Sequence, residues 1–135
     1  MAREITTTGT KLVSTLQKEF NANYPYLWLY VCPITGKEQV AKGDNLTSVD
    51  TSKTLSEIRT KKGTGQISLT GSKNIGTIER EFENIFGLYV QICYRSKDNN
   101  SFYTGKTDDS KSLTELNREK QSQDCKNFNG TYKIA

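Results

Sequence analysis

Paired carboxylates are the first residues in this chain whose type and spacing could do chemistry. Glu81 with Glu83, and Asp108 with Asp109, could share acid–base work between two neighbouring carboxyl groups. Glu81, however, stands on a predicted helix flank where an earlier helix carries Glu19, so we interpret it as structural or solvated. The chain contains 0 His, which excludes Ser-His-Asp and Cys-His sites. We therefore predict no catalytic residue.

Cysteines and glycines offer no stronger site. The cysteines are odd in number, widely spaced and without a Cys-x-x-Cys pair, which argues against a disulfide framework or a zinc site. We interpret Cys32 and Cys93 as packing residues, because only Arg95 stands near them as an activating neighbour. Residues 105–107 (Gly-Lys-Thr) lack the earlier glycine of a phosphate-binding loop, since Asn100 stands there. We predict no metal and no cofactor.

Aromatic residues interleaved with basic ones are the main functional signal. They concentrate in two predicted strands, where exposed rings can stack on nucleic-acid bases or anchor a protein partner. No RNP-type motif accompanies them, and Lys and Arg are mixed with Asp and Glu instead of forming a dense basic stripe. We favour protein contact and keep nucleic-acid binding as the alternative. The predicted partner-binding residues are Trp28, Tyr30, Tyr89, Tyr94, Arg95 and Lys97.

These residues lie in two segments that resemble each other. Residues 5–24 align with residues 67–86 without a gap, and the matches include Gly9 with Gly71 and Lys11 with Lys73. The pattern Asp-x-Ser-Lys-x-Leu-x-Glu also occurs twice, at residues 50–57 and 108–115. Helical periodicity accounts for matched apolar residues, but not for the matched glycines, lysines and the eight-residue pattern. We predict a tandem duplication, with repeat A over residues 3–62 and repeat B over residues 65–120.

Each repeat is predicted to form a β-α-β-β-α unit. A short strand ends at a glycine, and a helix follows with apolar residues on one face until Pro25 or Gly87 ends it. The next strand is residues 27–32 or 89–94, and the first of these is apolar on both faces, as expected of a central strand. Return strands are predicted at residues 38–41 and 101–104, and a short helix with a capping box closes each unit.

The predicted fold is α+β, with a pseudo-two-fold, mixed or antiparallel sheet covered by helices. Neither repeat has enough apolar surface to stand alone, so we expect one domain over residues 1–135. Residues 121–135 are polar apart from Phe128, Tyr132 and Ile134, and we predict a polar C-terminal tail that docks weakly or stays mobile.

Part of the chain also resembles a group of other proteins. The run from Phe82 to Ile92, followed by Thr107-Asp-Asp and Leu113-Thr-Glu, resembles a group of small uncharacterised bacterial proteins. In that group a phenylalanine-bearing helix runs into a Phe-Gly-Leu-x-Val-Gln strand. The resemblance covers roughly residues 11–120 and implies no activity. This chain differs from the group in being more basic and in lacking an acidic tail.

Composition limits the classes of function. The net charge is +4, with 19 Lys and Arg against 15 Asp and Glu, which is mildly basic. No apolar run approaches the roughly 20 residues of a membrane-spanning helix, and no signal peptide is recognisable, so we expect a cytoplasmic protein without a membrane partner. We predict a non-enzymatic protein-interaction or assembly module that self-associates or forms part of a bacterial or phage structure.

Overall fold

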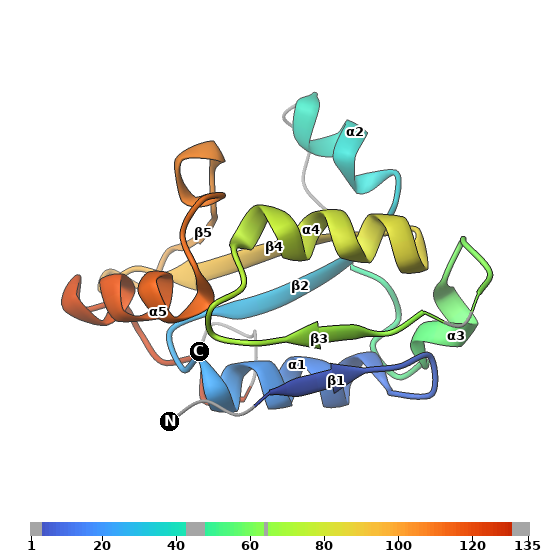
Figure 1. The fold of residues 1–135 in the computed structure, drawn as a ribbon. Coiled ribbons are helices and arrows are strands. Elements are labelled where there is room, and N and C mark those ends of the chain that lie inside the picture. Colours follow the sequence, from blue (N-terminus) through green and yellow to red (C-terminus); the bar gives the residue numbers. More distant parts are fainter. Residues whose placement is uncertain (1–3, 43–47, 64, 131–135) are drawn as a thin grey trace.

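An antiparallel sheet of three strands lies at the centre of the fold (Figure 1). The computed structural model describes residues 4–42, 48–63 and 65–130. The strands are ordered β2–β4–β5, with bounds Trp28–Pro33, Leu88–Arg95 and Ser101–Tyr103. The predicted α+β class is confirmed, and the sheet is antiparallel. The central strand is β4, so the expectation of a central position for residues 27–32 was wrong.

A second, two-stranded ribbon pairs β1 (Ile5–Thr7) with β3 (Ile67–Leu69). The principal helices are α1 (Val13–Asn23) and α4 (Ile75–Glu81), which continues as a π-helical turn (Phe82–Phe86). Gly87 ends this turn in the left-handed conformation, with φ of 63°. The shorter elements are α2 (Gly36–Ala41), α3 (Leu55–Ile58), a 3-10 turn (Lys106–Asp108) and α5 (Leu113–Ser122).

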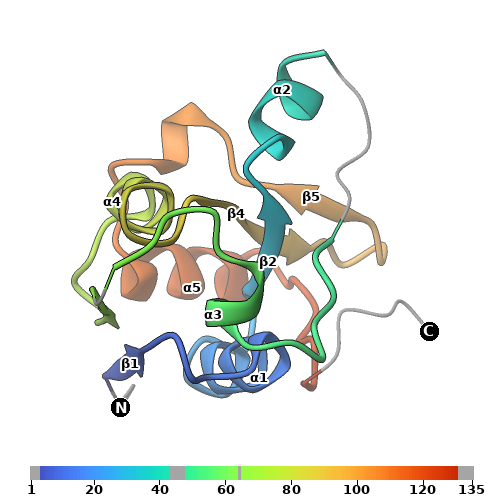
Figure 2. The ribbon, with the colours of Figure 1, turned by 90° about the vertical axis from the view of Figure 1, so that its right-hand side faces the viewer.

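The main core lies between one face of the three-stranded sheet and the helices. Alternate strand residues such as Leu29, Val31, Val90 and Ile92 point to this face and are fully buried. They meet the apolar faces of α1 and α4 and the inward side chains of the β1–β3 ribbon, including Phe20, Phe82 and Ile67. Figures 1 and 2 show α1 beside β1 and α4 on the β3 side of this ribbon. Burying both helix faces in one core explains why residues far apart in the chain fold together.

The short helices begin at capping boxes in both halves of the chain. Thr54 accepts a hydrogen bond from the backbone N–H of Glu57, whose carboxylate accepts one from the Thr54 backbone N–H. Ser112 and Glu115 make the same reciprocal pair at the start of α5. The predicted capping boxes are therefore present. Two isolated bridges, Leu12 with Thr54 and Asn74 with Ser112, hold these starts beside the larger helices.

The two halves differ after their first long strand. Residues 38–41, predicted as a return strand, are instead part of α2, where Gln39 N–H donates to the Thr35 carbonyl. The other predicted return strand is present as β5, because Asn99 adopts a positive φ of 69° and closes a tight hairpin turn. The corresponding stretch before Gly36 offers no such turn. Among the described residues, a β-α-β-β-α order is thus found in the second half and not in the first.

The opposite face of the sheet is covered at one end by the chain that follows α5. Residues 121–130, assigned from the sequence to a polar tail, begin with the last residues of α5 and carry Phe128 back over the sheet. The Phe128 ring is 1% exposed and lies 5.7 Å from the Trp28 ring, in a second cluster that includes Cys93. Tyr132 and Ile134 lie outside the described residues. Phe128 therefore acts as a core residue.

Replacing Phe128 should destabilise the whole fold. We expect Phe128→Ala to lower the free energy of unfolding by about 2–4 kcal/mol, because the substitution leaves a cavity against Trp28. Urea titration followed by Trp28 fluorescence measures this, since Trp28 is the single tryptophan. Phe102→Ala is the control, because the Phe102 side chain is already 46% exposed. Equal stability of the two variants would contradict the packing described.

Candidate functional site

The predicted partner-binding residues are divided between the two faces of the sheet. Trp28, Tyr30 and Tyr89 lie on the face opposite the main core, because their strand neighbours Leu29 and Val90 point into it. Arg95 shares their face, and Lys97 is exposed in the β4–β5 hairpin. Tyr94 lies on the core side, where its ring stacks on Phe102 at 5.5 Å and contacts the Lys120 ammonium at 3.9 Å. The structure does not gather the six residues into one surface.

Two of the six are buried. Trp28 is 4% exposed and Arg95 is 6% exposed, because Phe128 covers both of them. The Arg95 guanidinium lies over the Phe128 ring, 4.7 Å from its centroid. Neither side chain is accessible to a partner. The candidate surface therefore consists of the other residues on the face opposite the main core.

Tyr30, Tyr89 and Tyr103 form the accessible part of this face, and the buried Gln91 lies among them. Tyr30 stands directly opposite Gln91 on the neighbouring strand, and its ring lies 6.0 Å from the ring of Tyr103. Gln91 donates a hydrogen bond to the Tyr89 hydroxyl, which orients both side chains. Tyr103 is 41% exposed. We call these four residues the tyrosine face.

A pocket of about 300 Å³ opens beside the tyrosine face. Its lining includes Tyr89, Gln91 and Tyr103 together with Glu79 and Asp109. Glu79 belongs to α4, whereas Asp109 follows the 3-10 turn (Lys106–Asp108). We call this cavity the acidic pocket.

Gly76 brings the two carboxylates together. Its N–H donates to the Asp109 carbonyl at 3.0 Å, and a Cβ at Gly76 would lie only 3.2 Å from the Asp109 Cβ. The absence of a side chain lets the loop approach α4 closely. Glu79 lies one helical turn beyond Gly76 on the same side of α4, so Asp109 comes to rest beside it.

Glu79 has the most perturbed carboxyl group of the described residues. Burial and, to a smaller extent, the negative charge of Asp109 raise its pKa to about 7, although Arg80 opposes both effects. Burial also raises the pKa of Tyr89, whose hydroxyl therefore remains protonated. A carboxyl group that changes charge near neutral pH, in a cleft and beside a second carboxylate, is typical of a functional site.

The acidic pocket is suited to binding a cation. With Glu79 and Asp109 ionised, it presents two negative charges together with aromatic rings, a combination that favours an ammonium or guanidinium group. The cysteines give it no nucleophile: Cys32 and Cys93 are fully buried, and burial raises the pKa of Cys32 to about 12. Among the described residues, no three acidic or cysteine side chains are grouped to hold a metal ion.

The sequence singled out Asp109 but paired it with the wrong carboxylate. Asp108, its expected partner, is bound by the Lys111 ammonium at 2.9 Å, and Glu81 is bound by Lys73 at 2.6 Å. Glu79 escaped notice, although the alignment places it opposite Gln17, which is buried and donates to the Leu29 carbonyl at 3.0 Å. The alignment of the charged Glu79 with the neutral Gln17 was the sequence signal that could have identified Glu79.

Comparisons with protein-family models, curated proteins and solved structures found no match to this chain. Among the described residues, none of the helices has the length and apolar character needed to cross a membrane.

The raised pKa of Glu79 predicts a pH-dependent cost in stability. Glu79 binds its proton more tightly in the folded chain than in the unfolded one, so its contribution to stability is lost as pH rises through about 7. We expect Glu79→Gln to stabilise the protein by about 1–2 kcal/mol at pH 8, a value discounted for partial exposure, and by much less at pH 5.

Urea titrations at the two pH values test this expectation. Glu83→Gln is the matched control, because Glu83 follows on the same helical segment and makes an ion pair with Lys37 at 3.1 Å near the surface. A gain for Glu79→Gln that is the same at pH 5 and pH 8 would show that the carboxyl group is not perturbed as described.

Proposed function

We propose that this chain is a non-enzymatic protein-interaction module whose acidic pocket accepts a lysine or arginine side chain of its partner. The observation that carries this proposal is the pairing of Glu79 with Asp109 beside the tyrosine face. Removing water from a charged pair strengthens a bond to an incoming cation, and the neighbouring rings add a favourable surface for its alkyl stem.

The adjoining edge strand supports a protein partner. Phe102 and Tyr103 on β5 are 46% and 41% exposed, and with Leu12 they are the exposed large hydrophobic side chains of the described residues. In the described part of the chain, β5 pairs with β4 alone, so its outer edge carries no strand. Of the two rings, Tyr103 lines the acidic pocket, and an exposed aromatic ring beside charged groups is typical of a binding hot spot.

Electrostatics favours protein over nucleic acid as the partner. A phosphate approaching the tyrosine face would meet Glu79 and Asp109 and be repelled by them. Arg95, one of the two basic residues predicted to attract it, is buried under Phe128. Lys97 alone is a small basic footprint for a nucleic-acid site.

Blocked amino acids test the pocket directly. We expect N-acetyl-arginine amide and N-acetyl-lysine amide to shift the NMR signals of Tyr89, Gln91 and Tyr103 at pH 8. Binding should weaken as pH falls below about 7, because Glu79 then becomes protonated. The double variant Glu79→Gln/Asp109→Asn should lower the affinity about tenfold or more.

Leu12→Ala serves as the control, because Leu12 is exposed at the start of α1, on a different element from the pocket. Binding that is unchanged in the double variant would sink the proposal. If a labelled single-stranded oligonucleotide binds the original chain and the double variant equally at low salt, the nucleic-acid alternative is favoured instead. Light scattering on the same samples determines whether the partner is a second copy of the chain.

We also infer that residues 3–62 and 65–120 descend from one duplicated unit. Strand pairing supports this inference. Thr6 pairs with Ser68 in the β1–β3 ribbon, and Tyr30 pairs with Gln91 in the central sheet. In each case the two residues occupy equivalent positions in the two repeats, near the middle of the paired strands. Ion pairs repeat as well, since Lys11 binds Glu19 and Lys73 binds Glu81, both at 2.6 Å.

Matched lysine substitutions test this equivalence. Lys11 also donates to the Thr6 carbonyl and Lys73 to the Ser68 carbonyl, so each lysine ties its helix to its strand. We expect Lys11→Met and Lys73→Met each to destabilise the fold by about 1 kcal/mol, and by similar amounts. A loss confined to one of the two, measured by urea denaturation, would argue that the halves are not equivalent.

A further inference from the structure

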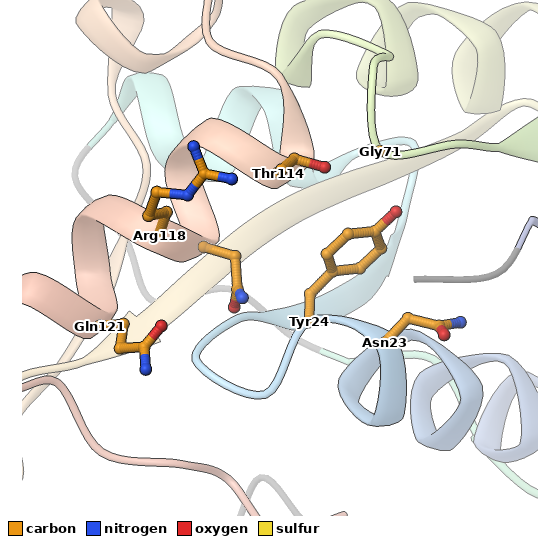
Figure 3. Close-up of a pocket in the computed structure, with 7 residues that line it drawn as sticks. Asn23, Tyr24, Gly71, Thr114, Arg118 and Gln121 are labelled. Carbon is orange, nitrogen blue, oxygen red and sulfur yellow. The ribbon is translucent and has the colours of Figure 1, made fainter. Parts of the chain in front are cut away.

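A second pocket, of about 420 Å³, lies between the end of α1 and the exposed side of α5 (Figure 3). Tyr24 rises from the end of α1, and Thr114, Asn117 and Arg118 come from α5. Gly71, before α4, closes the pocket above the Tyr24 hydroxyl (Figure 3). This pocket does not share a lining residue with the acidic pocket.

The Tyr24 hydroxyl is the unusual group of this pocket. The Tyr24 side chain is 1% exposed, and among the described residues its hydroxyl has no hydrogen-bond partner. A buried hydroxyl without a partner costs free energy, so its persistence needs an explanation. Burial raises the pKa of Tyr24, and the group therefore remains protonated and available as a donor.

The charge of the pocket is positive. Arg118 is its charged lining residue, and the other lining groups are hydroxyls and amides, including Thr114, Asn117 and Gln121. Asn117 is held in place because its side-chain oxygen accepts a hydrogen bond from the Tyr26 N–H at 3.0 Å, which leaves its NH₂ group as a donor. Arg118 also lines the groove along the outer side of α5 with Glu115 and Glu119, and among the described residues no carboxylate lines the pocket itself.

The aligned position in the other half is closed by the protein's own side chain. There Arg59, which aligns with Asn117, places its guanidinium 4.7 Å from the centroid of Phe86, which aligns with Tyr24. Arg59 also donates to the Ile85 carbonyl at 2.8 Å, so its guanidinium is engaged within the protein. With the shorter Asn117 in place of an arginine, a pocket remains beside Tyr24, whose hydroxyl is itself buried.

We propose that this second pocket binds an oxyanion, a carboxylate or phosphate group carried by a small molecule. Arg118 supplies the charge, and the Tyr24 hydroxyl, Thr114 and Asn117 supply neutral donors around it. This site is of opposite charge to the acidic pocket and is independent of the proposed protein contact. A ligand of this class would satisfy the hydroxyl that the protein leaves unpartnered.

Titrations of the full chain with inorganic phosphate and with acetate test the site, using sodium chloride at matched ionic strength as the reference. We expect saturable shifts of the backbone NMR signals of Thr114, Asn117 and Arg118, with a Kd of about 1 mM or tighter for at least one anion. The better binder identifies the source of the oxyanion. Saturation by neither anion would overturn the proposal.

Two variants separate binding from folding. Arg118→Met should weaken anion binding about tenfold or more, whereas Lys97→Met, which removes a cation that does not line the pocket, should leave the affinity unchanged. Tyr24→Phe introduces the residue found at the aligned position 86, so this variant should fold normally. Without ligand its melting temperature should be equal to or higher than that of the original chain. Its affinity for the anion should be reduced several-fold. If Arg118→Met and Lys97→Met bind the anion with equal affinity, the binding is nonspecific and the proposal of an anion site is wrong.

Discussion

The antiparallel pairing of β2 with β4 is the constraint on which the rest of the structure depends. Its register places Leu29 opposite Ile92 and Tyr30 opposite Gln91. The first pair faces the core and the second faces outward, so a slip of one residue would bury the polar set and expose the apolar one. The helices and the β1–β3 ribbon can cover the sheet only when this register holds, and the tyrosine face exists for the same reason.

Both candidate sites arise where the two halves of the chain differ in side chains at aligned positions. In the first half the neutral residues Gln17 and Thr51 occupy the places that Glu79 and Asp109 take in the second. Ser14 donates to the Thr51 carbonyl as Gly76 donates to that of Asp109, so the backbone arrangement is preserved while the charge changes. A framework built from backbone contacts tolerates such exchanges, because the contacts do not depend on the side chains that are replaced.

The two pockets also show how burial changes the behaviour of polar groups. In the acidic pocket, burial and a neighbouring charge move the titration of Glu79 close to neutral pH. In the second pocket, burial keeps Tyr24 neutral and leaves its hydroxyl without a partner. Each group is less stable than it would be in water, and each would gain from a ligand of the matching kind.

The sequence by itself determined those local features, such as helix faces and caps, that depend on residues close together in the chain. The apolar faces of α1 and α4 and the capping boxes at Thr54 and Ser112 were predicted correctly, because helix periodicity and caps depend on residues a few positions apart. The same reasoning misassigned residues 38–41 (Glu-Gln-Val-Ala), because so short a segment is compatible with either a strand or a helix.

Only the tertiary structure decided which residues meet across the chain. Phe128 covers Trp28 and Arg95 from a position about thirty residues beyond β4, and Asp109 reaches Glu79 because Gly76 leaves room for it. No local pattern encodes these contacts, since they follow from how the sheet, helices and loops close around a shared core. The residue types that could act were therefore evident from the sequence, but their exposure, partners and charge states were set by the fold.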